Sequence, residues 1–230
     1  MGIHPEYSED LAKIIIKNKK HVREEENFFL VKIKKTQFKT SKTILKLGKY
    51  SDLDELKKPE VIQMIERARE KKKKVFRERN EDTVKSRLHH PVENHLISSE
   101  FWTKRLKYRY ERKGKEKIKS KIKNSIHKGL DFAGKTGTTI YAMADGKVVI
   151  AEKMYFEGNY TLIDHGLGFF SGYMHQNEIF VEEGDKVIAG EKIGSIGETG
   201  AVTGAHLHVF IYIRGIFVDP MSLLVLPVRD

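Results

Sequence analysis

The spacing of apolar residues along the chain changes near Ile126. From there onward, short runs rich in β-branched and aromatic residues alternate with glycine-containing turns. Ten or more strands at this spacing predict an all-β sandwich or barrel-like domain. Two dipeptides that separate apolar runs, Asp145-Gly146 and Arg214-Gly215, predict tight two-residue hairpins.

The first half of the chain has a weaker and more mixed pattern. Residues 8–22 predict a short helix with Ser8 as its N-cap, and residues 27–34 have the composition of a strand. A longer helix is expected over about 53–79, with Pro59 in its first turn. We therefore expect a basic, largely helical accessory region over residues 1–87, of α or α+β type, and a separate domain over residues 88–230.

Charge separates the same two parts of the chain. Residues 1–126 carry 35 Lys and Arg against 19 Asp and Glu, whereas residues 127–230 carry 8 against 13. The charged end of the long helix, residues 69–81, is expected to be a solvated face, and residues 104–123 a solvated loop or attachment patch. These surfaces suit electrostatic contact with an anionic envelope polymer or a membrane surface. We expect no specific nucleic-acid partner, because no element that reads a groove can be identified.

Cysteine is absent, so any metal ion must be held by histidine and carboxylate side chains. No run approaches 18 apolar residues, and the N-terminus does not have the pattern of a signal peptide.

Three short histidine motifs supply the residue types that a zinc site needs. His127 and Asp131 form H-K-G-L-D, and His175 ends the strand-like run S-G-Y-M-H. His206 and His208 lie two residues apart in an apolar run, so a strand would place both imidazoles on one face. A catalytic zinc ion uses three protein ligands and leaves its fourth position to water. His127, Asp131 and one histidine of H-L-H can fill that requirement, and the other two histidines would be free to exchange protons.

These motifs, with D-H-G-L-G-F-F-S-G-Y-M-H and F-V-D-P, closely resemble the LytM/lysostaphin-type zinc endopeptidases, the beta-lytic metallopeptidase family. The resemblance implies a mainly β catalytic domain of the duplicated hybrid motif type, with an antiparallel β-sheet groove. It implies Zn²⁺ held by His127, Asp131 and His208, with His175 and His206 as the catalytic pair. Peptide cross-links of bacterial peptidoglycan would be hydrolysed by a zinc-activated water, and which histidine is the general base stays open.

The sequence departs from the family pattern in two places. Val209 and Phe210 follow H-L-H where the family often has Phe-Glu, which affects the support of the ligands rather than ligation. Upstream, Trp102 replaces a glycine in the family's Ser-x-Phe-Gly-x-Arg segment, and a long basic insertion follows it. We expect Trp102 to be a packing residue and the insertion to reshape one wall of the groove.

The remaining histidines are expected to have structural roles. His165 is predicted to be a hydrogen-bonded turn residue, and no metal is expected at His89, His90 or His95.

Two other functions are compatible with parts of the sequence. A non-catalytic family member could act as a scaffold that activates cell-wall amidases, although such proteins lack some of the ligands present here. A lipoyl-type carrier domain would leave the histidines unexplained. The substrate places the protein in the periplasm or cell envelope, by means of a signal or anchor segment absent from this chain, and we expect a monomer.

Overall fold

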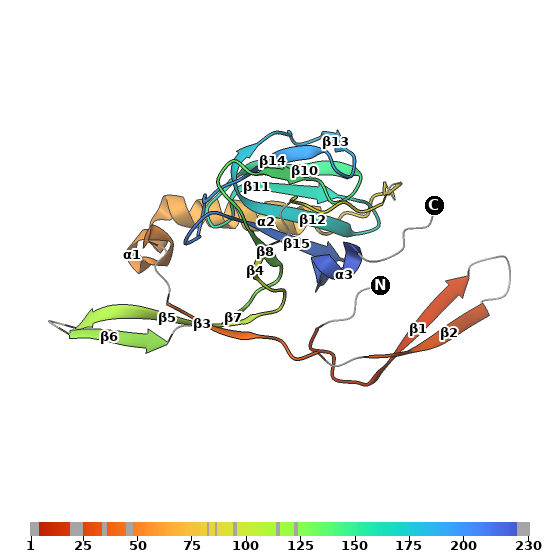
Figure 1. Cartoon of the computed structure of the whole chain (residues 1–230), viewed down its shortest axis with the longest axis horizontal. Coiled ribbons are helices and arrows are strands. Elements are labelled where there is room, and N and C mark those ends of the chain that lie inside the picture. Colours follow the sequence, from red (N-terminus) through yellow and green to blue (C-terminus); the bar gives the residue numbers. More distant parts are fainter. Residues whose placement is uncertain are drawn as a thin grey trace.

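The computed structural model describes residues 5–18, 25–33, 36–44, 48–81, 83–85, 87–93, 96–113, 116–121 and 124–224 (Figure 1). None of the helices in these ranges is both long enough and apolar enough to cross a membrane. Three of the ten histidines, His4, His21 and His95, lie outside the described residues, so the prediction for His95 stays a prediction.

A ten-stranded antiparallel sheet forms the body of the protein and confirms the predicted mainly β fold. Its strand order is β13-β10-β11-β12-β15-β8-β4. In addition, β14 pairs with β12 and β9, and β16 pairs with β15. The strands are β4 (Ile97–Ser99), β8 (Leu130–Ala133), β9 (Thr139–Tyr141), β10 (Gly146–Met154), β11 (Gly158–Asp164), β12 (Phe169–Ile179), β13 (Lys186–Val187), β14 (Lys192–Ile196), β15 (His206–Ile213) and β16 (Ile216–Val218). A short helix, α3, spans Pro220–Leu224.

The preceding part of the chain is of α+β type. Strands β1 (Leu11–Asn18) and β2 (Glu25–Lys32) form an antiparallel pair. Strand β3 (Thr40–Ile44) runs parallel to β5 (Lys104–Lys113), which also pairs with β6 (Glu116–Lys121) and β7 (Ser125–Ile126). The helices are the 3₁₀ turn η1 (Gly48–Ser51), α1 (Leu53–Leu56) and α2 (Pro59–Val75).

Two predictions for this region are wrong. Residues 8–22 contain strand β1 instead of a helix, because the β-branched run Ile14 to Ile16 finds a partner strand in β2. Residues 104–123, expected to be a solvated loop or an attachment patch, contain the hairpin β5–β6, so the loop prediction is wrong and the attachment patch stays a prediction. Leu106, Tyr108 and Tyr110 alternate with basic residues, which is typical of a strand, but the high density of charge in this segment favoured the loop prediction.

The two hairpin predictions had different outcomes. Arg214 and Gly215 join β15 to β16, and both have positive φ, 47° and 95°, as a two-residue turn of this kind requires, so this prediction is confirmed. Asp145-Gly146 does not form the expected hairpin, because the strand before it, β9, pairs with β14 instead of β10. Local turn chemistry was overridden here by pairing with a distant strand.

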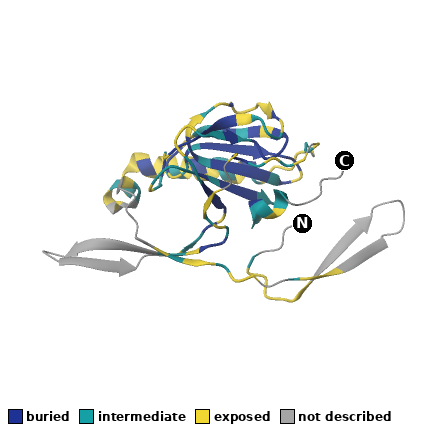
Figure 2. Ribbon diagram, in the orientation of Figure 1, coloured by how far each residue is buried: buried dark blue, intermediate teal, exposed yellow. Residues whose placement is uncertain are grey.

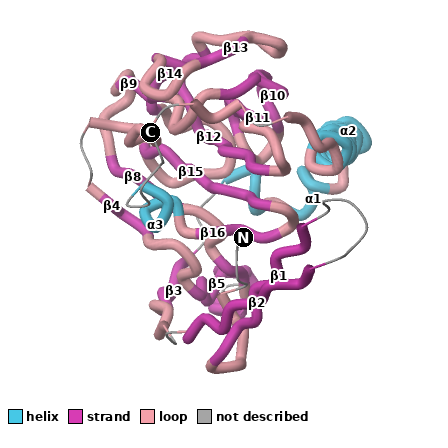
Figure 3. The backbone as a smooth tube through the Cα atoms, turned by 90° about the vertical axis from the view of Figure 1, so that its right-hand side faces the viewer, coloured by secondary structure: helices cyan, strands magenta, loops and turns pink. Residues whose placement is uncertain are grey.

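Helix α2 packs against one face of the sheet, as Figures 1 and 3 illustrate. The single helix expected over about 53–79 is instead two helices, α1 and α2, and α2 ends at Val75. Pro59 lies in the first turn of α2, as expected for proline. Ala68 and Val75 are buried against Ile150, Tyr160 and other sheet residues of the same cluster. The basic residues near its end are not simply solvated, because Lys71 pairs with Glu183 at 2.6 Å and Lys72 pairs with Glu157.

The alternation of side chains along β15 assigns its two faces to different environments. Leu207, Val209 and Ile211 enter the larger core cluster, whereas Phe210 enters the cluster that α2 covers. His206 and His208 share the Phe210 face. The strands that carry these residues are largely buried (Figure 2). The sheet therefore presents its histidines on the face where α2 lies.

His165 is fully buried and hydrogen-bonded, so the prediction for this residue is confirmed. Its Nδ1 lies 2.8 Å from the Asp145 carbonyl oxygen and its Nε2 lies 2.7 Å from Ser171 Oγ. Burial lowers the pKa of His165 to about 4, with smaller opposing effects from the Asp145 carbonyl and nearby carboxylates.

Acid is expected to destabilise the protein through His165. As pH falls below about 6.5, the unfolded chain takes up a proton that the folded chain resists until about pH 4. Between pH 7 and pH 5, this group should lower the free energy of unfolding by about 2 kcal/mol. Urea unfolding of metal-free wild type and His165→Asn at both pH values measures the effect. An equal loss in both proteins would contradict the role of His165.

Candidate active site

Strand pairing brings the predicted ligands together. His127 follows β7 directly, Asp131 lies on β8, and His208 lies on β15 opposite Asp131 in the antiparallel register. Gly129 lies between the first two residues, and a Cβ there would come within 2.3 Å of the Val209 carbonyl oxygen and 2.8 Å of the His208 ring. Glycine at this position therefore lets the H-K-G-L-D segment approach β15 closely enough for the three side chains to meet.

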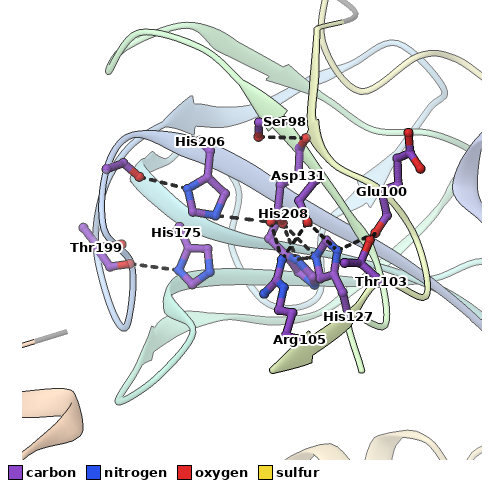
Figure 4. Close-up of polar contacts among 12 residues, drawn as sticks. Ser98, Glu100, Thr103, Arg105, His127, Asp131, His175, Thr199, His206 and His208 are labelled. Carbon is purple, nitrogen blue, oxygen red and sulfur yellow. Dashed lines mark hydrogen bonds and ion pairs between the residues drawn. The ribbon is translucent and has the colours of Figure 1, made fainter. Parts of the chain in front are cut away.

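Three atoms of this cluster point at one position (Figure 4). Asp131 Oδ1 lies 2.9 Å from His127 Nε2 and 2.7 Å from His208 Nδ1, and the two histidine nitrogens are 3.0 Å apart. Ligands of a tetrahedral zinc ion, with bonds of ~2.0–2.2 Å, are separated by roughly 3.3–3.5 Å. The cluster needs to open by only about half an ångström to accept the ion.

The hydrogen bonds around His127 explain why a cation belongs there. His127 Nδ1 lies 2.8 Å from the Glu100 carbonyl oxygen, which can only accept, so Nδ1 carries a proton. A neutral His127 then presents a lone pair from Nε2 toward the carboxylate oxygen of Asp131. Two lone pairs at that distance repel unless a proton or a metal ion lies between them. The donor set therefore fits a zinc ion.

The charge states of the cluster are those of a ligand set. Burial by itself would raise the pKa of Asp131, but hydrogen bonds with His127 and then His208, together with their charges, hold it well below its ordinary value. Burial lowers the pKa of His208, although Asp131 opposes this effect. An ionised carboxylate beside a neutral imidazole is the form that binds a metal.

His175 and His206 lie beside this cluster, and each directs its Nδ1 to a backbone carbonyl oxygen. His206 Nδ1 lies 2.8 Å from the Gly204 carbonyl oxygen, and His175 Nδ1 lies 3.0 Å from that of Thr199, so each Nδ1 donates. Their ring centroids are 5.1 Å apart, and His206 Nε2 is 3.9 Å from Asp131 Oδ1. Neither ring takes part in the close cluster, and both present a proton-accepting nitrogen next to it (Figure 4).

His175 also has a strained backbone. Its φ is 66°, in the left-handed region that non-glycine residues rarely adopt. Its amide donates to the Glu157 carbonyl at 2.8 Å, and the adjacent Gln176 carbonyl accepts from Thr199 Oγ1 at 2.7 Å. These bonds hold the ring in place, and strain of this kind is found preferentially at functional sites.

Arg105 is a further residue of the site that sequence reasoning missed. It donates to Asp131 Oδ2 at 2.7 Å and to Ser99 Oγ at 3.0 Å. The pairing leaves Oδ1 as the oxygen that faces the histidines. Arg105 lies in a run of basic residues that resembled a solvated surface, and the arginine of the Ser-x-Phe-Gly-x-Arg pattern aligns by spacing with the neighbouring Lys104. The linear pattern therefore did not single out Arg105.

Replacing Arg105 by glutamine is expected to weaken zinc binding by about tenfold, because the orientation of Asp131 is lost. Loss of the positive charge beside the site would by itself strengthen zinc binding. This electrostatic effect is smaller than the loss of orientation, because the guanidinium of Arg105 is partly solvated. A chelator competition titration measures the affinity. Lys104→Gln, at the exposed neighbouring position, is the matched control, and tighter binding by Arg105→Gln would contradict the orienting role.

Trp102 is buried, consistent with the expected packing role. Its ring lies 5.4 Å from Phe101 and 6.3 Å from Phe38, and its amide donates to the His127 carbonyl at 2.8 Å. Its φ of 59° is in the left-handed region, which explains why glycine suits the same position in the resembling family. Aromatic packing compensates for the unfavourable backbone conformation next to a ligand.

The remaining described histidines lie outside the cluster. His89 Nδ1 lies 2.7 Å from the His90 carbonyl oxygen, and His90 Nδ1 lies 2.6 Å from that of Val92. In the described ranges of the chain, His127, Asp131 and His208 form the one group with metal-ligand spacing.

Comparisons with known proteins point in the same direction as the geometry. A family model described as Peptidase family M23 matches residues 125–220. Peptidoglycan DD-endopeptidase ShyA of Vibrio cholerae serotype O1 is 43% identical over 96 residues, covering 42% of this chain and 22% of that protein. Murein hydrolase activator NlpD of Escherichia coli K12 is 38% identical over 99 residues, covering 43% of this chain and 26% of that protein. The aligned part is therefore about a quarter of the length of these curated relatives.

A solved structure extends the similarity beyond the matched domain. A Pseudomonas aeruginosa protein described as a peptidase M23 superposes with a TM-score of 0.66 at 25% identity. The superposition covers 97% of this chain and 76% of that protein. The similarity therefore takes in the accessory region as well as residues 125–220.

Proposed function

We propose, from the premise that residues 125–220 form a domain of peptidase family M23, that this protein is a zinc-dependent endopeptidase acting on peptide cross-links of bacterial peptidoglycan. His127, Asp131 and His208 would hold the ion, and His175 and His206 would be the catalytic pair. Residues 88–230 would form the catalytic domain, with residues 1–87 as the accessory region.

The observation that carries this proposal is the convergence of His127 Nε2, Asp131 Oδ1 and His208 Nδ1, each within 3.0 Å of the other two. An ionised Asp131 and a neutral His208 match the needs of a divalent cation.

A bound zinc ion would supply a Lewis acid that lowers the pKa of a coordinated water to about 7 and polarises the scissile carbonyl. The protein's own residues would then move the protons. His175 and His206 each hold their Nδ1 proton on a backbone carbonyl, so Nε2 is the atom that accepts a proton from the attacking water. The imidazole that becomes protonated can donate to the developing oxyanion and then to the leaving amine.

The decisive experiment is digestion of purified sacculi followed by mass spectrometry of the released muropeptides. Wild type should release fragments cut within peptide cross-links, and removal of zinc with a chelator should stop the release. Cuts confined to glycan bonds, or activity that persists without metal, would contradict the proposal.

A second candidate function is that of a non-catalytic activator of cell-wall amidases, favoured by the similarity to the activator NlpD. The complete set of His127, Asp131, His208, His175 and His206 supports the enzyme instead. Zinc content of protein purified without chelators separates the two functions. A ratio near one zinc per chain is expected, and a ratio near zero would favour the activator.

The substrate implies the periplasm or cell envelope as the place of action. The DD-endopeptidase description of ShyA, similar over the domain, supports peptidoglycan. The basic accessory region would make electrostatic contact with anionic envelope polymers or membrane surfaces, without specific nucleic-acid binding. We propose a monomer, which sedimentation of the full chain can test.

A further inference from the structure

A pocket of 380 Å³ lies between helix α2 and the histidine face of the sheet. It extends to the ring of the metal ligand His208, and Met174, Phe210 and Phe217 supply apolar parts of its lining. The α2 side of the pocket comes from outside residues 125–220, so the accessory region contributes directly to the surface beside the candidate metal centre.

The polar lining of this pocket is cationic. Arg69, Lys72, Lys73 and Lys128 line it, and its described lining residues include no carboxylate. Lys72 is paired with Glu157, and Lys73 lies near exposed Glu70. Within the described part of the chain, Arg69 and Lys128 form no ion pair with an acidic side chain, so at least two cationic groups are available to a ligand.

Tyr160 adds a buried polar group to the same pocket. The residue is 0% exposed, and its hydroxyl has no hydrogen-bond partner among the described residues. A buried hydroxyl without a partner costs free energy, so it is normally paired.

We propose that this pocket is a substrate subsite that binds a free carboxylate next to the scissile bond, with Arg69 and Lys128 as its cationic groups. The apolar floor receives the aliphatic part of the same residue. The ion pairs of Lys71 with Glu183 and of Lys72 with Glu157, both in connections between strands of the sheet, hold α2 in position, so the pocket exists before the substrate arrives. This inference rests on the proposed peptidase function and assigns a substrate feature to the accessory helix.

The test compares two synthetic substrates. One is a dimer of D,D-cross-linked stem peptides with free α-carboxylates flanking the scissile amide, and the other has those carboxylates converted to carboxamides. Zinc-loaded full-length wild type should cleave the acid form with kcat/KM about tenfold higher than the amide form. Arg69→Gln should reduce this ratio toward one, mainly through KM, and Arg69→Lys should retain part of it.

Lys74→Gln is the matched control, because Lys74 lies on the same helix but lines a different pocket, beside Lys147 and Val148. It should keep the ratio of wild type. A wild-type ratio near one, or an equal loss of the ratio in Lys74→Gln, would overturn the subsite.

Binding measurements separate this inference from the proposed function. If wild type cleaves neither dimer, the peptidase proposal fails for this bond, and calorimetry with the uncleaved dimers decides the subsite. Acid binding at least fivefold tighter than amide binding in wild type, and lost in Arg69→Gln, would support the subsite. Equal affinities would overturn it.

Discussion

Replacement of His208 by alanine is expected to lower the hydrolysis of sacculi by at least about a thousandfold and to abolish stoichiometric zinc binding. His208 Nδ1 makes the shortest contact with Asp131 Oδ1, at 2.7 Å, and its removal leaves two protein ligands. The neighbours Leu207 and Val209 hold β15 in the core, so the strand should persist. Metal analysis and muropeptide release measure the two effects on the same preparation.

His89→Ala is the matched control for this experiment. His89 is an exposed histidine whose ring nitrogen lies near the His90 carbonyl, away from the metal cluster. This variant should keep both zinc and activity. If His208→Ala bound one zinc per chain and released muropeptides at the wild-type rate, the assignment of the metal centre would be wrong.

Loss of either histidine of the proposed catalytic pair should give a different result, in which zinc remains and turnover falls. His206→Ala and His175→Asn are expected to lower kcat by about 10²–10⁴-fold, the range for removal of a general acid or base. Asparagine is chosen at position 175 because it tolerates the positive φ found there better than alanine does. The Nε2 atoms of both rings face the site without joining the ligand cluster.

Single-turnover rates on a cross-linked dimer, with zinc content determined for each variant, check this prediction. A loss of zinc equal to that of His208→Ala would make the residue a ligand instead. Wild-type turnover in either variant would remove that histidine from the mechanism.

Much of the fold could be predicted because its signals are local. Alternation along residues 206–213 placed His206 and His208 on one face, and the structure has this strand as β15. The turn at Arg214-Gly215 has positive φ at both positions, and glycine adopts that conformation without a steric cost. The metal motif was readable because ligand spacing is set by bond lengths of the ion and by short connections between strands.

Other features depended on contacts that are distant in sequence. Residues 8–22 had a helical cap signal, but strand β2 provided a hydrogen-bonding partner for the isoleucine run. Asp145-Gly146 had hairpin chemistry, but β9 paired with β14. Arg105 was one basic residue among many until the fold placed it against Asp131.

The sequence by itself thus determined which side chains can bind zinc and that a mainly β domain carries them, because residue type and periodicity are local properties. Only the tertiary structure decided which ring nitrogen of each histidine faces the cluster, which oxygen of Asp131 faces the histidines, and where helix α2 lies. Those features depend on backbone carbonyls and strand registers from distant segments. Hydrogen-bond geometry of that kind has no signature in a linear pattern.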